Sequence, residues 1–117
     1  MKTLGNSNMS KTGDVTITIE ASGAVSQAVD CRGRQAIAFI VPIMTSTSLA
    51  VHASSDNVTF YPAYYNGVAV TIAASGTATW QSIPSNTLAG ANYIRLVPNG
   101  TEAAKRSITV IGLQLVN

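Results

Sequence analysis

The stretch Val-Thr-Ile-Thr-Ile at residues 15–19 decides the fold class of this chain. Its aliphatic residues alternate strictly with threonines, which is the period of a β-strand with one buried face. Val, Ile and Thr suit a pleated surface, and together they contribute 34 of the 117 residues. No window of a dozen residues carries the apolar stripe of a helix. The sequence therefore predicts an all-β protein.

Further strand-like runs follow at short intervals, with turn residues between them. Asn66-Gly67 is a hairpin signal, and the run at residues 35–41 is apolar on both faces, which favours a central strand. Nine short strands with this spacing predict a two-sheet antiparallel β-sandwich of jelly-roll type. The nine expected strands cover residues 15–19, 24–29, 35–41, 49–54, 58–61, 68–72, 77–83, 93–97 and 107–115.

The length of 117 residues suits one domain with one core. Residues 1–13 are polar, contain glycine and show no periodicity, so we expect a flexible N-terminal arm that becomes ordered only when something binds it. Residues 14–117 form the single predicted β-sandwich domain.

Only 10% of the residues are charged, against about 25% in ordinary domains, and the net charge is +2. Such a small imbalance does not make the basic surface of a nucleic-acid binder. The longest apolar run, residues 36–44, is interrupted by Pro42 and is too short for a membrane span. Residues 1–8 contain no apolar segment of the kind found in secretory signals. We expect neither a nucleic-acid nor a membrane partner.

Catalytic and metal-binding patterns are absent from the sequence. The single histidine, His52, alternates away from Leu49 and Val51, which predicts an outward-facing strand residue. The five acids are scattered, no motif cradles a phosphate, and the single cysteine, Cys31, cannot by itself form a disulfide or a metal site. We therefore expect no enzyme, no catalytic residue, no metal and no cofactor.

Two segments carry a resemblance to known β-sandwiches. Residues 49–60 read Leu-Ala-Val-His-Ala-Ser-Ser-Asp-Asn-Val-Thr-Phe, and residues 91–98 read Ala-Asn-Tyr-Ile-Arg-Leu-Val-Pro. They are similar to the Ser-x-Asp-Gly-x-x-aromatic turn and the Tyr-Ile-Arg strand of discoidin-like, galactose-binding-type jelly rolls. Asn57 stands where those domains usually have glycine, and asparagine tolerates the same left-handed conformation. Because those domains are longer, the match covers a core and omits their binding loops.

A second resemblance covers residues 29–115 and concerns small structural proteins of tailed bacteriophages. The shared order is Val29-Asp30, a glycine turn at Gly33, an aliphatic strand ending in proline, the hairpin at residues 54–60, and later Val-Thr-Ile, Tyr-Ile-Arg and basic-aliphatic strands. It implies a virion component assembled in the host bacterial cytoplasm: a capsid decoration (cement) protein, a head-fibre base or a tail accessory protein. This chain departs from the pattern at Arg32 and Arg34, where relatives tend to be apolar or glycine.

Low charge adds a physical argument for assembly. A monomeric surface normally carries charges of both signs, whereas here 25 Ser and Thr residues supply much of the polarity. Part of that surface is expected to be buried against other copies and against a larger lattice, although a hydroxyl-rich soluble domain is the plain alternative. We expect a homo-oligomer, with a trimer favoured, that binds the major capsid protein.

Candidate contact residues follow from these hypotheses. Tyrosines before the predicted hairpin are expected at the subunit interface, and the alternative is a platform for sugars in a carbohydrate-binding module. Phe60 and Trp80 are expected in the core. The predicted capsid contacts are Arg32, Arg34, Lys2 and Lys11, and the predicted subunit contacts are Tyr61, Tyr64 and Tyr65.

Overall fold

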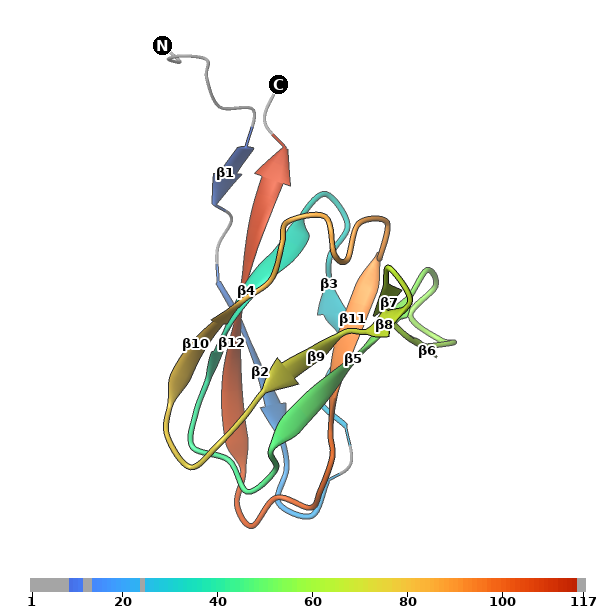
Figure 1. Cartoon of the computed structure of the whole chain (residues 1–117). Coiled ribbons are helices and arrows are strands. Elements are labelled where there is room, and N and C mark those ends of the chain that lie inside the picture. Colours follow the sequence, from blue (N-terminus) through green and yellow to red (C-terminus); the bar gives the residue numbers. More distant parts are fainter. Residues whose placement is uncertain (1–8, 12–13, 24, 116–117) are drawn as a thin grey trace.

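The alternating residues 15–19 form strand β2, and its Ile17 and Ile19 are buried. The structure is a computed structural model that describes residues 9–11, 14–23 and 25–115, with the backbone alone for 9–11 and 113–115. This part of the chain contains twelve strands and no helix (Figure 1). The strands are β1 (Met9–Lys11), β2 (Val15–Ile19), β3 (Val29–Asp30), β4 (Gln35–Val41), β5 (Ser48–Ser54), β6 (Tyr61–Pro62), β7 (Tyr64–Tyr65), β8 (Val68–Ala69), β9 (Thr71–Ala73), β10 (Thr79–Ser82), β11 (Tyr93–Pro98) and β12 (Arg106–Leu115).

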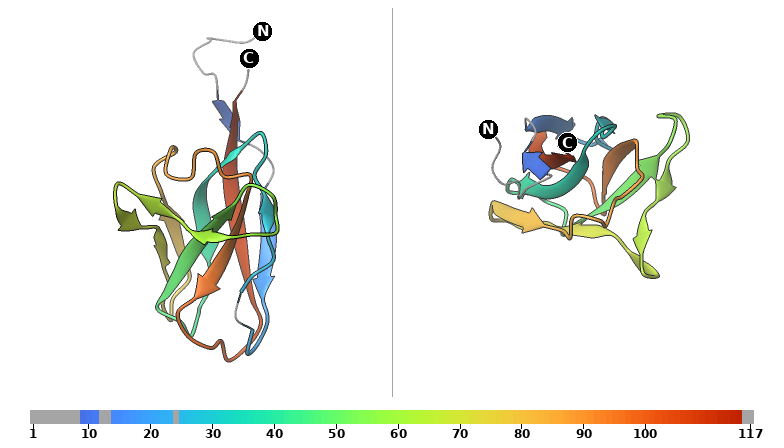
Figure 2. Two further views of the ribbon diagram at one scale, coloured as in Figure 1. Left: turned by 90° about the vertical axis from the view of Figure 1, so that its right-hand side faces the viewer. Right: turned by 90° about the horizontal axis from the view of Figure 1, so that it is seen from above.

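Two antiparallel sheets make up the body of the molecule. In the first, here called the β4 sheet, β12 pairs with β2 and β1 along one side and with β4 on the other, and β4 also pairs with β10. In the second, the β5 sheet, β11 pairs with β3 and β5, and the far side of β5 pairs with β6 and β9. Strands β7 and β8 form a separate hairpin (Figure 2).

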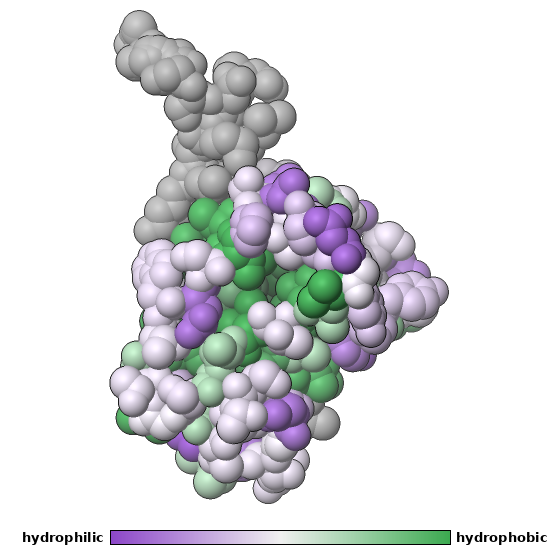
Figure 3. All heavy atoms as spheres, viewed as in Figure 1, coloured by the Kyte–Doolittle hydropathy of each residue, from purple (hydrophilic) through white to green (hydrophobic). Residues whose placement is uncertain are grey.

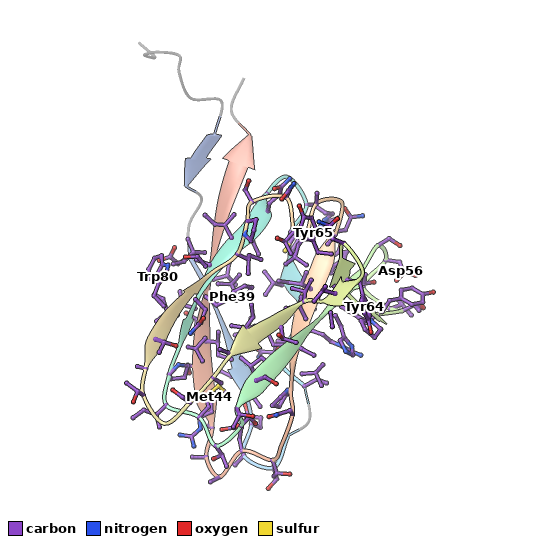
Figure 4. The ribbon with its side chains drawn as sticks, in the orientation of Figure 1. Phe39, Met44, Asp56, Tyr64, Tyr65 and Trp80 are labelled. Carbon is purple, nitrogen blue, oxygen red and sulfur yellow. The ribbon has the colours of Figure 1, made fainter. Side chains whose placement is uncertain are left out.

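One apolar core lies between the two sheets. The β4 sheet contributes Phe39 and Ile108, and the β5 sheet contributes Leu49 and Leu96, all of them fully buried. Phe39 points into this space, and Met44 lies toward the end where β4 turns into β5 (Figure 4). Burial of such side chains stabilises the fold by about 1.5–3 kcal/mol each.

The predicted all-β class and the antiparallel β-sandwich are confirmed, while the jelly-roll type stays a prediction. Strand count and bounds differ from expectation in places. The run at residues 24–29 contributes only β3, and the strand expected at residues 58–61 begins at Tyr61 because a hydrogen-bonded turn occupies residues 54–59. The hairpin at Asn66-Gly67 is confirmed, since both residues have positive φ, 53° and 77°, as a type I′ turn requires.

Part of the predicted N-terminal arm is a strand. Met9–Lys11 form β1 and pair with Leu113–Leu115, while the flexibility of the arm stays a prediction. The physical reason for this pairing is the length of β12: β2 pairs only with Arg106–Val110, so the last residues of β12 extend past β2 and offer backbone groups on that side. Residues 1–8 and 12–13 lie outside the described residues.

A buried carboxylate ties two loops together at the end of the sandwich. Glu102 is 1% exposed and accepts hydrogen bonds from the backbone N–H groups of Thr45 and Ser46 and, at 2.9 Å, from Arg106 Nε. Burial by itself would raise the pKa of Glu102, but these donors outweigh it and lower the pKa to about 2. The ionised carboxylate therefore holds the β4–β5 loop against the start of β12.

Candidate functional site

The β7–β8 hairpin and the strand before it carry the predicted subunit tyrosines. Tyr61 is 67% exposed and Tyr64 is 63% exposed, whereas Tyr65 packs against the core. Alternation explains the difference between the adjacent Tyr64 and Tyr65, since successive strand residues point to opposite faces. Figure 4 shows Tyr64 projecting outward at the edge of the molecule. Two of the three predicted tyrosines are thus exposed to solvent.

A groove of about 350 Å³ lies beside these tyrosines. It is lined by residues 53–55, residues 61–64 and the loop at residues 87–91. None of these residues is charged. The Thr87 hydroxyl is buried and makes no hydrogen bond. The groove therefore suits an uncharged occupant.

Two residues that line the groove, Ser54 and Ser55, belong to a compact turn. Ser54 Oγ accepts hydrogen bonds from the N–H groups of Asp56 and Asn57, and the Asp56 carboxylate accepts from the N–H groups of Val58 and Thr59. The Thr59 and Val58 donors, with the Ser54 hydroxyl, lower the pKa of Asp56. Asn57 adopts the left-handed conformation, with φ 63°. The Asp56 carboxylate thus accepts its hydrogen bonds from groups of its own turn.

The predicted capsid-contact arginines lie in one turn after β3. Arg32 pairs with Asp30 at 2.7 Å and lies over the Tyr93 ring at 5.3 Å, and its hydrogen bonds lower the pKa of Asp30 to about 2. Arg34 is half-buried, and its N–H closes the turn by donating to the Cys31 carbonyl. Both arginines are partly exposed, but Arg32 is already paired with an acid.

The backbone of Lys11 lies at the same end of the β4 sheet as this turn. Lys11 pairs with Leu113, and Leu113 also pairs with Gln35, the residue that follows Arg34; the side chain of Lys11 is not described. Lys2 lies outside the described residues. Of the predicted contacts whose side chains are described, Arg32 and Arg34 lie together in this turn.

Two aromatic residues occupy positions other than those predicted. Trp80, expected in the core, is 59% exposed on β10, and its indole N–H donates to the Ser82 hydroxyl at 3.0 Å. Phe60, also expected in the core, is half-buried, and the Arg95 guanidinium lies over its ring at 4.3 Å. Figure 4 shows Trp80 on the flank opposite Tyr64, pointing away from the sandwich.

The outward-facing His52 is opposite Arg95 on the neighbouring strand. Burial, and then the charge of Arg95, lower the pKa of His52, so the imidazole is neutral at pH 7. No acid is hydrogen-bonded to it among the described residues. Within the same residues no group of three His, Cys, Asp or Glu side chains is placed to hold a metal ion, and no helix is long and apolar enough to cross a membrane.

A division of charge runs through the whole molecule and was missed in the sequence. Residues 35–94, here called the charge-poor half, contain one Asp, Glu, Lys or Arg, which is Asp56; the other eleven lie before or after them. The charge-poor half comprises strands β4 to β10. In each sheet these strands lie on the same side: β4 and β10 in the β4 sheet, and β5, β6 and β9 in the β5 sheet. At the opposite edges lie β2, which is flanked by Asp14 and Glu20, and β3, which contains Asp30 (Figures 1 and 2).

Exposed apolar side chains follow the same division. Among the described residues, eight large hydrophobic side chains are exposed, and seven belong to the charge-poor half: Ile40, Ile43, Val58, Tyr61, Tyr64, Val68 and Trp80. The eighth is Val25. Figure 3 shows the face bordered by β9 and β10, where apolar residues line a hollow. Most of the exposed large hydrophobic side chains therefore belong to residues 35–94, although Arg95 contacts this half at Phe60 and Arg106 contacts it at Thr45.

No protein-family model matches the sequence, and no match to it is found among curated proteins.

Proposed function

We propose that this chain is a non-enzymatic structural protein of a bacteriophage virion, which self-associates and decorates the capsid by binding the major capsid protein. The observation that carries the proposal is the division between a charge-poor half with seven exposed hydrophobic side chains and a charged remainder. A protein that bridges capsid subunits needs two surfaces, one for its own copies and one for the shell. The sequence resemblance over residues 29–115 supports the identity of the assembly as a virion.

In this proposal, apolar contact rather than charge holds the particle together. Burial of apolar area contributes about 25 cal/mol per Å² before the costs of association, and many weak copies on a lattice gain from multivalency. The turn that carries Arg32 and Arg34 is the proposed contact with an acidic capsid surface. A trimer would place such contacts around a local symmetry axis of the shell.

The test uses particles of the phage that encodes the chain. Mass spectrometry of purified particles is expected to find the protein in many copies, and adding it back to stripped shells is expected to raise the temperature at which they break. Double replacement of Arg32 and Arg34 by alanine should weaken shell binding, whereas Lys105→Ala, which removes an exposed lysine elsewhere, should not. Absence of the protein from purified particles would overturn the proposal, and its presence only in fibres or tails would favour an accessory role.

The groove beside Tyr61 and Tyr64 favours a second candidate, a carbohydrate-binding module. Exposed tyrosine rings stack on the apolar faces of sugars, and an uncharged groove of about 350 Å³ accepts a neutral sugar unit. A glycan screen with the wild-type protein and with a variant in which both tyrosines are alanine separates the candidates. A sugar bound only by the wild type would support the module, and no response to sugars agrees with the virion proposal.

A further inference from the structure

We propose that the charge-poor half is the surface through which this chain binds a second copy of itself. The proposal extends the proposed function, because it names the face used for self-association. It does not depend on which particle the assembly belongs to.

Self-complementarity is the first argument for a second copy as the occupant. In a closed oligomer, a surface near the symmetry axis meets the same surface of its neighbours. A surface that carried several lysines or several aspartates would place like charges opposite each other, which costs several kcal/mol. Residues 35–94 avoid this cost because their one charged residue, Asp56, is already bonded within its turn. The residues before 35 and after 94 carry the other eleven charges, so a surface made of them would not avoid this cost.

The edges of the two sheets give a second, independent argument. An exposed edge strand offers free backbone groups to another chain, and proteins usually protect such edges with charged residues or proline. At the charged side, β2 is flanked by Asp14 and Glu20, and β3 contains Asp30. At the charge-poor side, β9 and β10 contain neither a charged residue nor a proline and are not directly flanked by one, whereas β6, which pairs with the other end of β5, contains Pro62. The protection is therefore missing at the two edges that border the hollow face.

Size and shape agree with this use of the surface. A standard interface covers about 800 Å² on each partner, roughly an eighth of the 6264 Å² that this chain exposes. The charge-poor half spans about half of the chain and includes the exposed Trp80 at one flank and the Tyr61–Tyr64 groove at the other. Tyrosine and tryptophan are the residues that most often anchor interfaces. The surface is large enough and carries suitable anchors.

Matched lysine substitutions test the proposal, because a lysine buried in an interface without a partner weakens association. Val68 is 68% exposed in the charge-poor half, and Val25 is 41% exposed outside it. Sedimentation equilibrium of the purified full chain should show self-association of the wild type, weakened at least a hundredfold by Val68→Lys and by Trp80→Lys. Val25→Lys should leave the dissociation constant unchanged. Circular dichroism of each variant checks that the fold is retained.

Two results would overturn the proposal: a wild type that stays monomeric at millimolar concentration, or a Val25→Lys variant that dissociates as strongly as the other two. Its failure is distinguishable from failure of the proposed function. A chain that binds capsids as a monomer would refute the self-association face and leave the virion role standing. A chain that associates through residues 35–94 but is missing from particles would refute the virion role and leave the self-association face standing. A monomer that binds sugars would favour the carbohydrate-binding module.

Discussion

Trp80 on β10 is paired with Ile40 on β4, and both side chains are exposed on the outer surface of the β4 sheet. A tryptophan and an isoleucine side by side on an edge strand and its neighbour form an apolar patch that water covers poorly. Val68 and the exposed tyrosines of the hairpin region lie on the opposite flank, so the charge-poor half carries exposed apolar side chains on both flanks. We interpret this surface as an interface between copies of the chain.

Fluorescence of Trp80, the single tryptophan of the chain, should report on that interface. Iodide is expected to quench its emission strongly in dilute solution, where the indole is exposed to solvent. At concentrations where the protein associates, quenching should weaken because the partner covers the side chain. A Stern–Volmer series over protein concentration measures this. Equal quenching at all concentrations would show that Trp80 is not part of the contact.

Replacing Glu102 by glutamine should destabilise the fold by about 2–4 kcal/mol. The change removes the charge that Arg106 and the N–H groups of Thr45 and Ser46 require, and it leaves buried donors poorly paired. Urea denaturation at a fixed protein concentration measures the loss. Glu20→Gln is the control, since Glu20 is exposed and 3.9 Å from Lys105, and its effect should stay within about 0.5 kcal/mol. Equal losses for both variants would refute the role of Glu102 as a clamp.

Acid should weaken the fold between about pH 5 and pH 2. In the unfolded chain the Glu102 carboxyl takes up a proton near its usual pKa of 4.5, whereas in the folded chain its pKa is about 2. The unfolded state therefore binds more protons in this window, so stability falls as the pH falls. The lowered pKa values of Asp30 and Asp56 act in the same direction. Thermal melts should show a shallower acid decline for the Glu102→Gln variant, and an unchanged decline would contradict this explanation.

The thiol of Cys31 should be unreactive in the folded protein. Burial raises its pKa to about 11, which lowers the thiolate fraction about a hundredfold relative to a thiol of pKa 9. Alkylation by iodoacetamide at pH 8, followed by mass spectrometry, should be slow for the native protein and fast in denaturant. Fast labelling of the folded chain would mean that the turn around Cys31 opens readily.

Local patterns in the sequence predicted much of the fold. Strands β2 and β4 were predicted with the observed bounds, β2 from its strict alternation and β4 from a continuous apolar run that turn residues bound. The Asn66-Gly67 turn was predictable because few other residue pairs adopt positive φ twice in succession. These features depend on neighbours in the chain, which the sequence displays directly.

Features that depend on distant contacts were not predictable. Trp80 alternates with polar neighbours, so nothing local indicated which face of its strand would be buried. Glu102 reads as one more scattered acid, because its partners Thr45 and Ser46 are 57 and 56 residues away. The absence of charge over residues 35–94, by contrast, is visible in the sequence. Its meaning depends on the structure, which places those strands on the same side of both sheets.

A dilution series of amide ¹H–¹⁵N spectra tests the central claim most directly, because it locates the contact between copies residue by residue. As the protein is diluted, the signals that move should belong to residues 35–94, above all to β9, β10 and the β7–β8 hairpin. Signals from β2 and from the Asp30–Arg34 turn should stay in place. Spectra that do not change with concentration, or changes concentrated in β2 and that turn, would contradict the assignment of the charge-poor half as the self-association face.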